Sequence, residues 1–176
     1  GTVAGSCGGA LAKAGSLTVD ASGNIEGATF TAETADVVLT ADGNIASTTV
    51  TAATDATLTA VRIANSAVAA VTGSIVTDGN IFDSTLTAQG DVTITNAYYV
   101  SNNMVVAGGK IDVTQNVTKV VGGSYLADGD IDVLAAGLIA SATFDSGAIV
   151  TLDATGNIEL VNVKANDTAT LTSGAN

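Results

Sequence analysis

Residues 35–50 read Ala-Asp-Val-Val-Leu-Thr-Ala-Asp-Gly-Asn-Ile-Ala-Ser-Thr-Thr-Val, and the rest of the chain repeats this motif with variations. Its tripeptide Gly-Asn-Ile recurs at residues 23–25, 43–45, 79–81 and 156–158. The isoleucines of these tripeptides are 20, 36 and 77 residues apart, close to one, two and four periods of about 19. A fixed period of this length is typical of a solenoid, in which each repeat forms one turn of a coil.

Apolar residues recur in four columns at this period. The first column contains Val19, Leu39, Leu58, Ile75, Ile94, Val113, Val133, Leu152 and Leu171. The second, two residues earlier, contains Leu17, Val37, Ala56, Gly73, Val92, Ile111, Ile131, Val150 and Ala169. The third contains Ile25, Ile45, Ile63, Ile81, Val100, Val120, Ile139 and Ile158. The fourth contains Phe30, Val50, Val68, Leu86, Val105, either Tyr125 or Leu126, Phe144 and Val163.

Within each repeat the apolar residues alternate with polar ones, which is the periodicity of β-strands. Most of the apolar residues are β-branched, and glycine, asparagine and aspartate separate the short runs where the chain must turn. Short strands at this period stack on their equivalents one turn later, so each rung pairs with the rungs above and below. We therefore predict one all-β domain over residues 1–176, a single parallel β-helix with nine first-column rungs, roughly 40 Å long.

The composition limits the possible partners. The chain is 47% hydrophobic but only 3% aromatic, which suits a narrow core of small aliphatic side chains. Five basic and 17 acidic residues give a net charge of −12, which repels phosphate backbones and argues against a nucleic-acid partner. No apolar run has the length of a membrane span. Gly1 in place of an initiator methionine fits a processed, exported chain, and the single cysteine excludes a disulfide within the chain.

The sequence predicts no enzyme, no catalytic residue and no cofactor. Rungs of about 17–20 residues leave no loop long enough to build a cleft, and there is no histidine to act as an acid or base. The basic residues are spread along the chain, at Lys13, Arg62, Lys110, Lys119 and Lys164.

Three acidic turns have two interpretations. Residues 42–44, 78–80 and 128–130 are expected to share one turn region, where Asp42, Asp78, Asp128 and Asp130 offer oxygen ligands. These residues either suit the turn conformation or bind calcium weakly between subunits. Because the turns are not on consecutive rungs, we expect their carboxylates to be about 10 Å apart or more.

A partial asparagine ladder is predicted at one turn. Its members are Asn24, Asn44, Asn80 and Asn157, and their amides could hydrogen-bond along the axis. Arg62, Tyr99, Lys119 and Leu138 interrupt it.

The sequence begins with the later part of a rung and ends with the early part of one, so its two ends are complementary. Residues 1–15 are weakly patterned; Leu11 is expected in the fourth column, and Cys7 in the half rung before the first clear one. Residues 168–176 form the first half of another rung. Neither end has the polar cap that solenoids ordinarily need. We therefore expect head-to-tail self-assembly in which Val3, Cys7 and Leu11 meet Thr168, Ala169, Thr170, Leu171 and Thr172.

Threonine is frequent at outward positions. One column contains Thr18, Thr57, Thr93, Thr151 and Thr170, and the next contains Thr40, Thr59, Thr95, Thr114 and Thr172. Threonine suits an exposed strand. A flat Thr-x-Thr array also resembles the ice-binding faces of some β-solenoids.

Lines such as Gly90-Asp91-Val92-Thr93-Ile94-Thr95 and Asp78-Gly79-Asn80-Ile81 resemble the repeats of filamentous haemagglutinin-type exoproteins. This resemblance implies a right-handed coil, a secreted or cell-surface location, and adhesive or fibrous use with surface or matrix contacts. A weaker likeness is to bactofilins, cytoskeletal β-helices that polymerise end to end. We expect the structural subunit of an extracellular homopolymeric filament; the alternatives are a stalk segment of a large surface adhesin and an ice-binding face.

Overall fold

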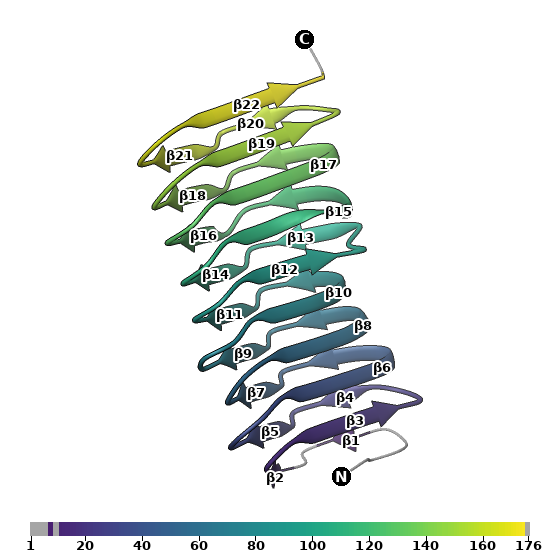
Figure 1. The fold of residues 1–176 in the computed structure, drawn as a ribbon. Helices are drawn as coiled ribbons and strands as arrows, with labels where there is room; N and C mark the ends of the chain where they lie inside the picture. The colour runs from purple at the N-terminus through teal and green to yellow at the C-terminus, as the bar shows by residue number, and fades with distance from the viewer. Residues whose placement is uncertain (1–6, 9–10, 175–176) are drawn as a thin grey trace.

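The computed structural model describes residues 7–8 and 11–174. It is an all-β parallel β-solenoid of about eight turns with rungs of about 19 residues and no helix, as predicted (Figure 1). The nine first-column positions enclose about eight full turns, because each turn runs from one position to the next.

Two parallel sheets run the length of the rod. The 13-stranded sheet consists of β1 (Cys7–Gly8), β3 (Leu17–Ala21), β4 (Ile25–Glu26), β6 (Val37–Ala46), β8 (Ala56–Ala64), β10 (Ile75–Phe82), β12 (Val92–Thr95), β13 (Tyr99–Ser101), β15 (Ile111–Val121), β17 (Ile131–Ala140), β19 (Val150–Ala154), β20 (Ile158–Glu159) and β22 (Ala169–Ser173). The nine-stranded sheet consists of β2 (Leu11–Ala14), β5 (Thr29–Ala32), β7 (Thr49–Ala52), β9 (Ala67–Ala70), β11 (Thr85–Ala88), β14 (Met104–Ala107), β16 (Ser124–Ala127), β18 (Thr143–Ser146) and β21 (Asn162–Ala165).

The strand register confirms the third and fourth columns. Each third-column isoleucine or valine lies opposite its predicted equivalent on the next rung. In the fourth column the register selects Tyr125, which pairs with Val105 and Phe144 and is fully buried. Leu126 is 45% exposed on the outer surface. These side chains form one continuous core along the rod.

The prediction for the first column was wrong at one rung. Thr77, not Ile75, lies opposite Leu58 and Ile94, and Ile75 takes the second-column position that had been given to Gly73. Thr77 is fully buried, and its hydroxyl has no hydrogen-bond partner within the part of the chain that the structure describes. Threonine has nearly the shape of valine, so its packing suits an inward strand position although its hydroxyl does not.

One backbone position adopts a left-handed conformation on every turn. It lies two residues after the third column, with φ between 48° and 71°, at Gly27, Ser47, Asn65, Asp83, Asn102, Gly122, Ser141 and Leu160. Glycine, asparagine and aspartate tolerate this conformation, because they have no Cβ or have a short polar side chain that bonds locally. Ser47, Ser141 and Leu160 are the exceptions; Leu160 is the bulkiest of the three and is 87% exposed, so little packing compensates the strain.

Replacing Leu160 by asparagine is therefore expected to raise the free energy of unfolding by about 1 kcal/mol. Urea unfolding followed by circular dichroism would measure this gain. The matched control is Leu134→Asn, which removes another exposed leucine, 44% accessible, from a position without positive φ. An equal gain in both variants would attribute the effect to surface hydrophobicity instead of backbone strain.

Two sets of side chains bond to the backbone at the turns. Four buried residues that follow the left-handed position form a polar ladder, made of Thr48, Ser66, Ser84 and Asn103. Each of the last three accepts a hydrogen bond from the backbone N–H of the ladder residue one rung before. At the opposite edge, an acidic corner ladder of Asp36, Asp55, Ser74, Asp91 and Asp130 accepts N–H groups from the following rung. Backbone N–H groups of the turns, which have no partner in strand pairing, thus donate hydrogen bonds to side chains of a neighbouring rung.

Candidate functional site

The last rung leaves one edge of each strand unpaired. Within the described residues, β20 pairs only with β17, β21 only with β18, and β22 only with β19. All five residues of β22 are exposed. Leu171 is 48% exposed, whereas its first-column equivalent one rung earlier, Leu152, is fully buried. This end of the rod therefore exposes both unpaired backbone groups and core positions.

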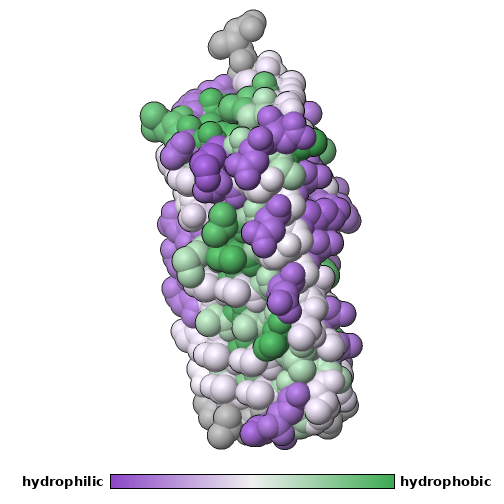
Figure 2. Space-filling model, turned by 60° about the vertical axis from the view of Figure 1, so that its left-hand side comes forward, coloured by the Kyte–Doolittle hydropathy of each residue, from purple (hydrophilic) through white to green (hydrophobic). Residues whose placement is uncertain are grey.

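Hydrophobic side chains gather at this end. Ile158, Val161, Val163 and Ala165 pack against the core but are only partly buried. In the space-filling view, hydrophobic atoms are grouped next to the C-terminal residues (Figure 2). An exposed apolar group beside an open strand edge is suited to cover by another rung.

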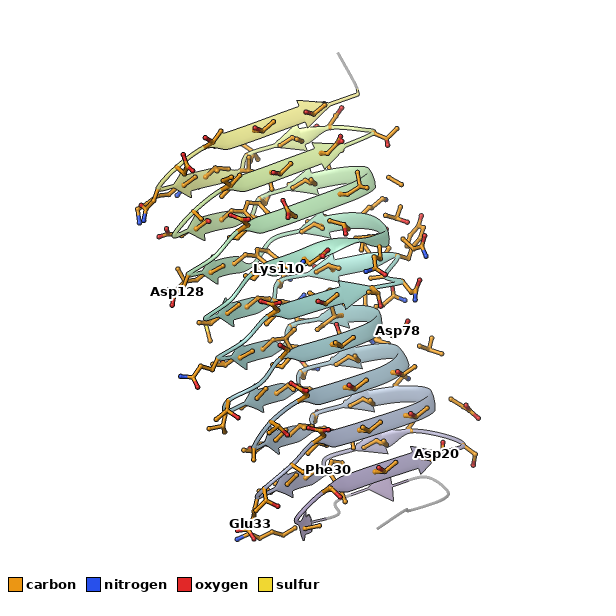
Figure 3. All side chains as sticks on the ribbon, viewed as in Figure 1. Asp20, Phe30, Glu33, Asp78, Lys110 and Asp128 are labelled. Carbon is orange, nitrogen blue, oxygen red and sulfur yellow. The ribbon has the colours of Figure 1, made fainter. Side chains whose placement is uncertain are left out.

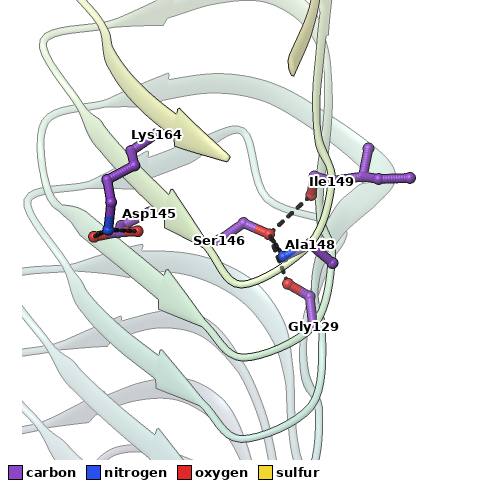
Figure 4. Close-up of polar contacts among 6 residues, drawn as sticks. All are labelled: Gly129, Asp145, Ser146, Ala148, Ile149 and Lys164. Atoms are coloured by element: carbon purple, nitrogen blue, oxygen red, sulfur yellow. Dashed lines mark hydrogen bonds and ion pairs between the residues drawn. The ribbon is translucent and has the colours of Figure 1, made fainter. Parts of the chain in front are cut away.

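Side-chain contacts connect the last rungs at this end. Lys164 Nζ lies 2.9 Å and 3.0 Å from the two carboxylate oxygens of Asp145, across the edge of the nine-stranded sheet (Figure 4). The Ser146 hydroxyl accepts the Ala148 N–H at 2.9 Å and lies 2.7 Å from the Gly129 carbonyl oxygen (Figure 4). The Lys164–Asp145 pair and the Ser146–Gly129 contact each join neighbouring rungs.

The other end has the predicted phase. β1 pairs with the third-column strand β4, and β2 pairs with the fourth-column strand β5. These strands are the second half of a turn, and β22 is the first half. One assignment was wrong: Ala12 lies opposite Phe30, and Leu11 lies opposite Thr29, because the count of 19 residues is one too many here. Val3 lies outside the described residues.

Burial differs between the two ends. The inward residues of β3, Leu17, Val19 and Ala21, are 4%, 0% and 0% exposed. Their equivalents in β22 are all exposed. The first-column and second-column positions are therefore more accessible in β22 than in β3.

The asparagines share a column, but their amides do not stack. Asn24 Oδ1 accepts the Asn44 backbone N–H at 2.9 Å, and Asn80 Oδ1 accepts the Tyr99 N–H at 2.8 Å. The Asn157 amide donates to Glu159 on its own rung. At Asn24 and Asn80 the side-chain oxygen thus accepts a backbone N–H of the next rung instead of a neighbouring amide, as in the acidic corner ladder. An amide-to-amide bond occurs elsewhere, between Asn116 and Asn96.

The acidic turns do not share one region, and that part of the calcium hypothesis was wrong. Asp42 and Asp78 lie after the first column, whereas Asp128 and Asp130 lie before the second, near the opposite edge of the rung. Asp78 and Asp128 project from opposite sides of the rod (Figure 3). In the described part of the chain, no three aspartate, glutamate or cysteine side chains gather in a way that could hold a metal ion.

Sequence analysis did not identify the acidic corner ladder. Its signal is an aspartate directly before the second column, at Asp36, Asp55, Asp91 and Asp130. The Thr54 hydroxyl and then the Asp55 N–H donate hydrogen bonds to Asp36, which lowers the pKa of that carboxyl.

The outward threonines form two incomplete faces. On the 13-stranded sheet, Val38, Val76, Asp112 and Asp132 interrupt the column of Thr18 and Thr57. A longer uncharged block lies on the nine-stranded sheet, over four successive rungs, at Thr29, Thr31, Thr49, Thr51, Ala67, Ala69, Thr85 and Thr87. The threonines beside the first column do not predict this block, because its threonines lie on the strands that contain the fourth column.

One open groove of about 270 Å³ lies at the turn before the third column. It is lined by Thr114, Asn116, Val117, Leu134, Ala136 and Thr155. The groove arises where the register shifts, because the four-residue step from Val113 to Val117 on β15 lies opposite the two-residue step from Val133 to Ala135 on β17.

No helix that is long and apolar enough to cross a membrane occurs in the described structure. No protein-family model, curated protein or solved structure matches this chain.

Proposed function

We propose that this chain is the structural subunit of an extracellular filament, in which copies stack head to tail through their terminal rungs. The observation that carries this proposal is the exposed rung of β20, β21 and β22, with Leu171 at its centre. Unpaired parallel edges with exposed core positions favour the addition of another rung.

The half rungs at the two ends define which strands would pair when a second copy is added. The next copy would place β1 on β20, β2 on β21 and β3 on β22, which continues both sheets in parallel. In this register Leu171 lies next to Val19 of the added copy, so the first column continues across the junction. Two features oppose stacking: Lys164 comes close to Lys13 of the added copy, and Val19 is already buried in the single chain. The Lys13–Glu33 and Lys164–Asp145 pairs reduce the first cost.

Replacing Leu171 by aspartate is expected to abolish filaments, because the junction would bury an unpaired carboxylate. Electron microscopy and sedimentation at neutral pH would compare this variant with the unchanged chain. The matched control is Leu126→Asp, which changes a leucine of similar exposure, 45% against 48%, away from the ends. We expect filaments from the unchanged chain and the control, and single rods from Leu171→Asp.

Three results would contradict the proposal: single rods from the unchanged chain at all concentrations, dimers that do not extend, or equal loss of filaments in both variants. The first would favour the alternative, a stalk segment of a larger adhesin, in which further rungs of the same protein cover β22. The uninterrupted stacking of about eight turns is compatible with that use.

A further inference from the structure

The outer aromatic residues are gathered at one place on the rod. Phe30, Tyr125 and Phe144 are fully buried in the core. Of the other three aromatic residues, Phe82 and Tyr99 are half-buried in the 13-stranded sheet, and Tyr98, which directly precedes β13, is exposed. The ring centroids of Phe82 and Tyr99 are 6.2 Å apart, and those of Tyr98 and Tyr99 are 4.9 Å apart.

Two basic side chains lie against these rings. The Arg62 guanidinium carbon is 4.7 Å from the centroid of Phe82. Lys119 Nζ is 5.1 Å from the Tyr99 centroid and 5.8 Å from that of Tyr98, and it is 3.3 Å from the Tyr99 hydroxyl oxygen. Such cation–π contacts hold the charges in place on the surface.

These two cations differ from the other basic residues. Lys13, Lys110 and Lys164 each form an ion pair, with Glu33, Asp112 and Asp145 respectively. In the described part of the chain, neither Arg62 nor Lys119 has a carboxylate within ion-pair distance. A chain with a net charge of −12 thus has its two side-chain cations that lack an ion pair on the same face, each beside a surface ring.

The cluster is aligned with the rod axis. Arg62, Asn80, Tyr99 and Lys119 lie opposite one another on four successive rungs, and Phe82 and Tyr98 flank this line. We call these six residues the aromatic–cationic face. With a spacing of about 4.8 Å per rung, Arg62 and Lys119 are roughly 14 Å apart along the axis.

We propose that the aromatic–cationic face binds a linear acidic polysaccharide lying along the rod. A sugar ring presents an apolar face that stacks on an aromatic side chain, and its uronate carboxylate pairs with a fixed cation. One rung step is close to the length that one sugar unit adds to an extended chain, so successive units meet successive rungs. A nucleic acid also has stackable rings, but its dense phosphate charge is repelled more strongly by this acidic protein. The proposal is independent of filament assembly.

Calorimetric titration of the 176-residue chain at low salt would test this inference. The probe is a polygalacturonate oligomer, compared with a neutral cello-oligosaccharide and with single-stranded oligothymidylate. We expect saturable binding of polygalacturonate that weakens as salt is added, and weaker binding of the other two. Failure of the unchanged chain to bind polygalacturonate, or tighter binding of the oligonucleotide, would overturn the proposal.

Variants assign the binding to this face. The double variant Arg62→Gln/Lys119→Gln is expected to weaken binding about tenfold, and Tyr98→Ala by a similar factor, because Tyr98 is 56% exposed and available for stacking. The matched control, Lys13→Gln/Lys110→Gln, removes the same charge from two paired lysines and should leave affinity within about twofold. Equal weakening in both double variants would reduce the effect to net charge and refute the site. Circular dichroism verifies that each variant keeps the β-solenoid.

Discussion

Gly79→Ala is expected to lower the free energy of unfolding by about 3 kcal/mol or more. Gly79 has a φ of +120°, in a region that is essentially restricted to glycine. A Cβ added there would lie 1.8 Å from the Ala60 carbonyl oxygen of the preceding rung. That oxygen belongs to the backbone of β8, so the clash is relieved only if the register shift between β8 and β10 changes.

The same rung position elsewhere provides the control. Gly137 also lies two residues before a third-column isoleucine, but it has no positive φ, and its added Cβ would lie 3.0 Å from the Thr118 carbonyl oxygen. We expect Gly137→Ala to cost only about 1 kcal/mol. Urea unfolding of both variants would measure the difference. Similar losses would mean that the rungs adjust freely at this corner and that Gly79 is not specifically required.

The third column could be predicted completely because it combines two signals. From Ile25 to Ile158 its positions are isoleucine or valine on every rung, and a turn follows at a constant distance. The first column lacks such a turn signal, and the apolar Ile75 matches its residue pattern better than Thr77, which occupies the position. Periodicity identifies inward positions reliably only where their residue types agree with burial.

The aromatic–cationic face could not be found by the same reasoning. Arg62, Tyr99 and Lys119 interrupt the asparagine ladder, and in the sequence they are 20 residues or more apart. Only the register brings them together, because side chains on successive rungs are neighbours across a strand spacing. The departures from a repeat are therefore the positions to examine for binding, whereas its regular positions maintain the fold.

Asn103→Leu is expected to lower the free energy of unfolding by about 3 kcal/mol, although the leucine side chain has the same branching at Cγ. Asn103 is 1% exposed, and its Oδ1 accepts the backbone N–H of Ser84 at 2.9 Å. Leucine fills the space but leaves this buried N–H without an acceptor, which costs the desolvation of the donor. The amide of Ser84 should also exchange its hydrogen much faster, as measured by NMR.

Asn103→Ser distinguishes the hydrogen bond from packing. Serine occupies the equivalent positions at Ser66 and Ser84, where the hydroxyl accepts the N–H of the ladder residue one rung before at 3.2 Å. It is smaller than asparagine but keeps an acceptor, so we expect a loss of only about 1 kcal/mol and continued protection of the Ser84 amide. If Asn103→Leu proved the more stable of the two, packing would outweigh the polar ladder at this corner. If Asn103→Ser is the more stable variant, as we expect, then side-chain acceptors join neighbouring rungs at the turns, where strand pairing ends.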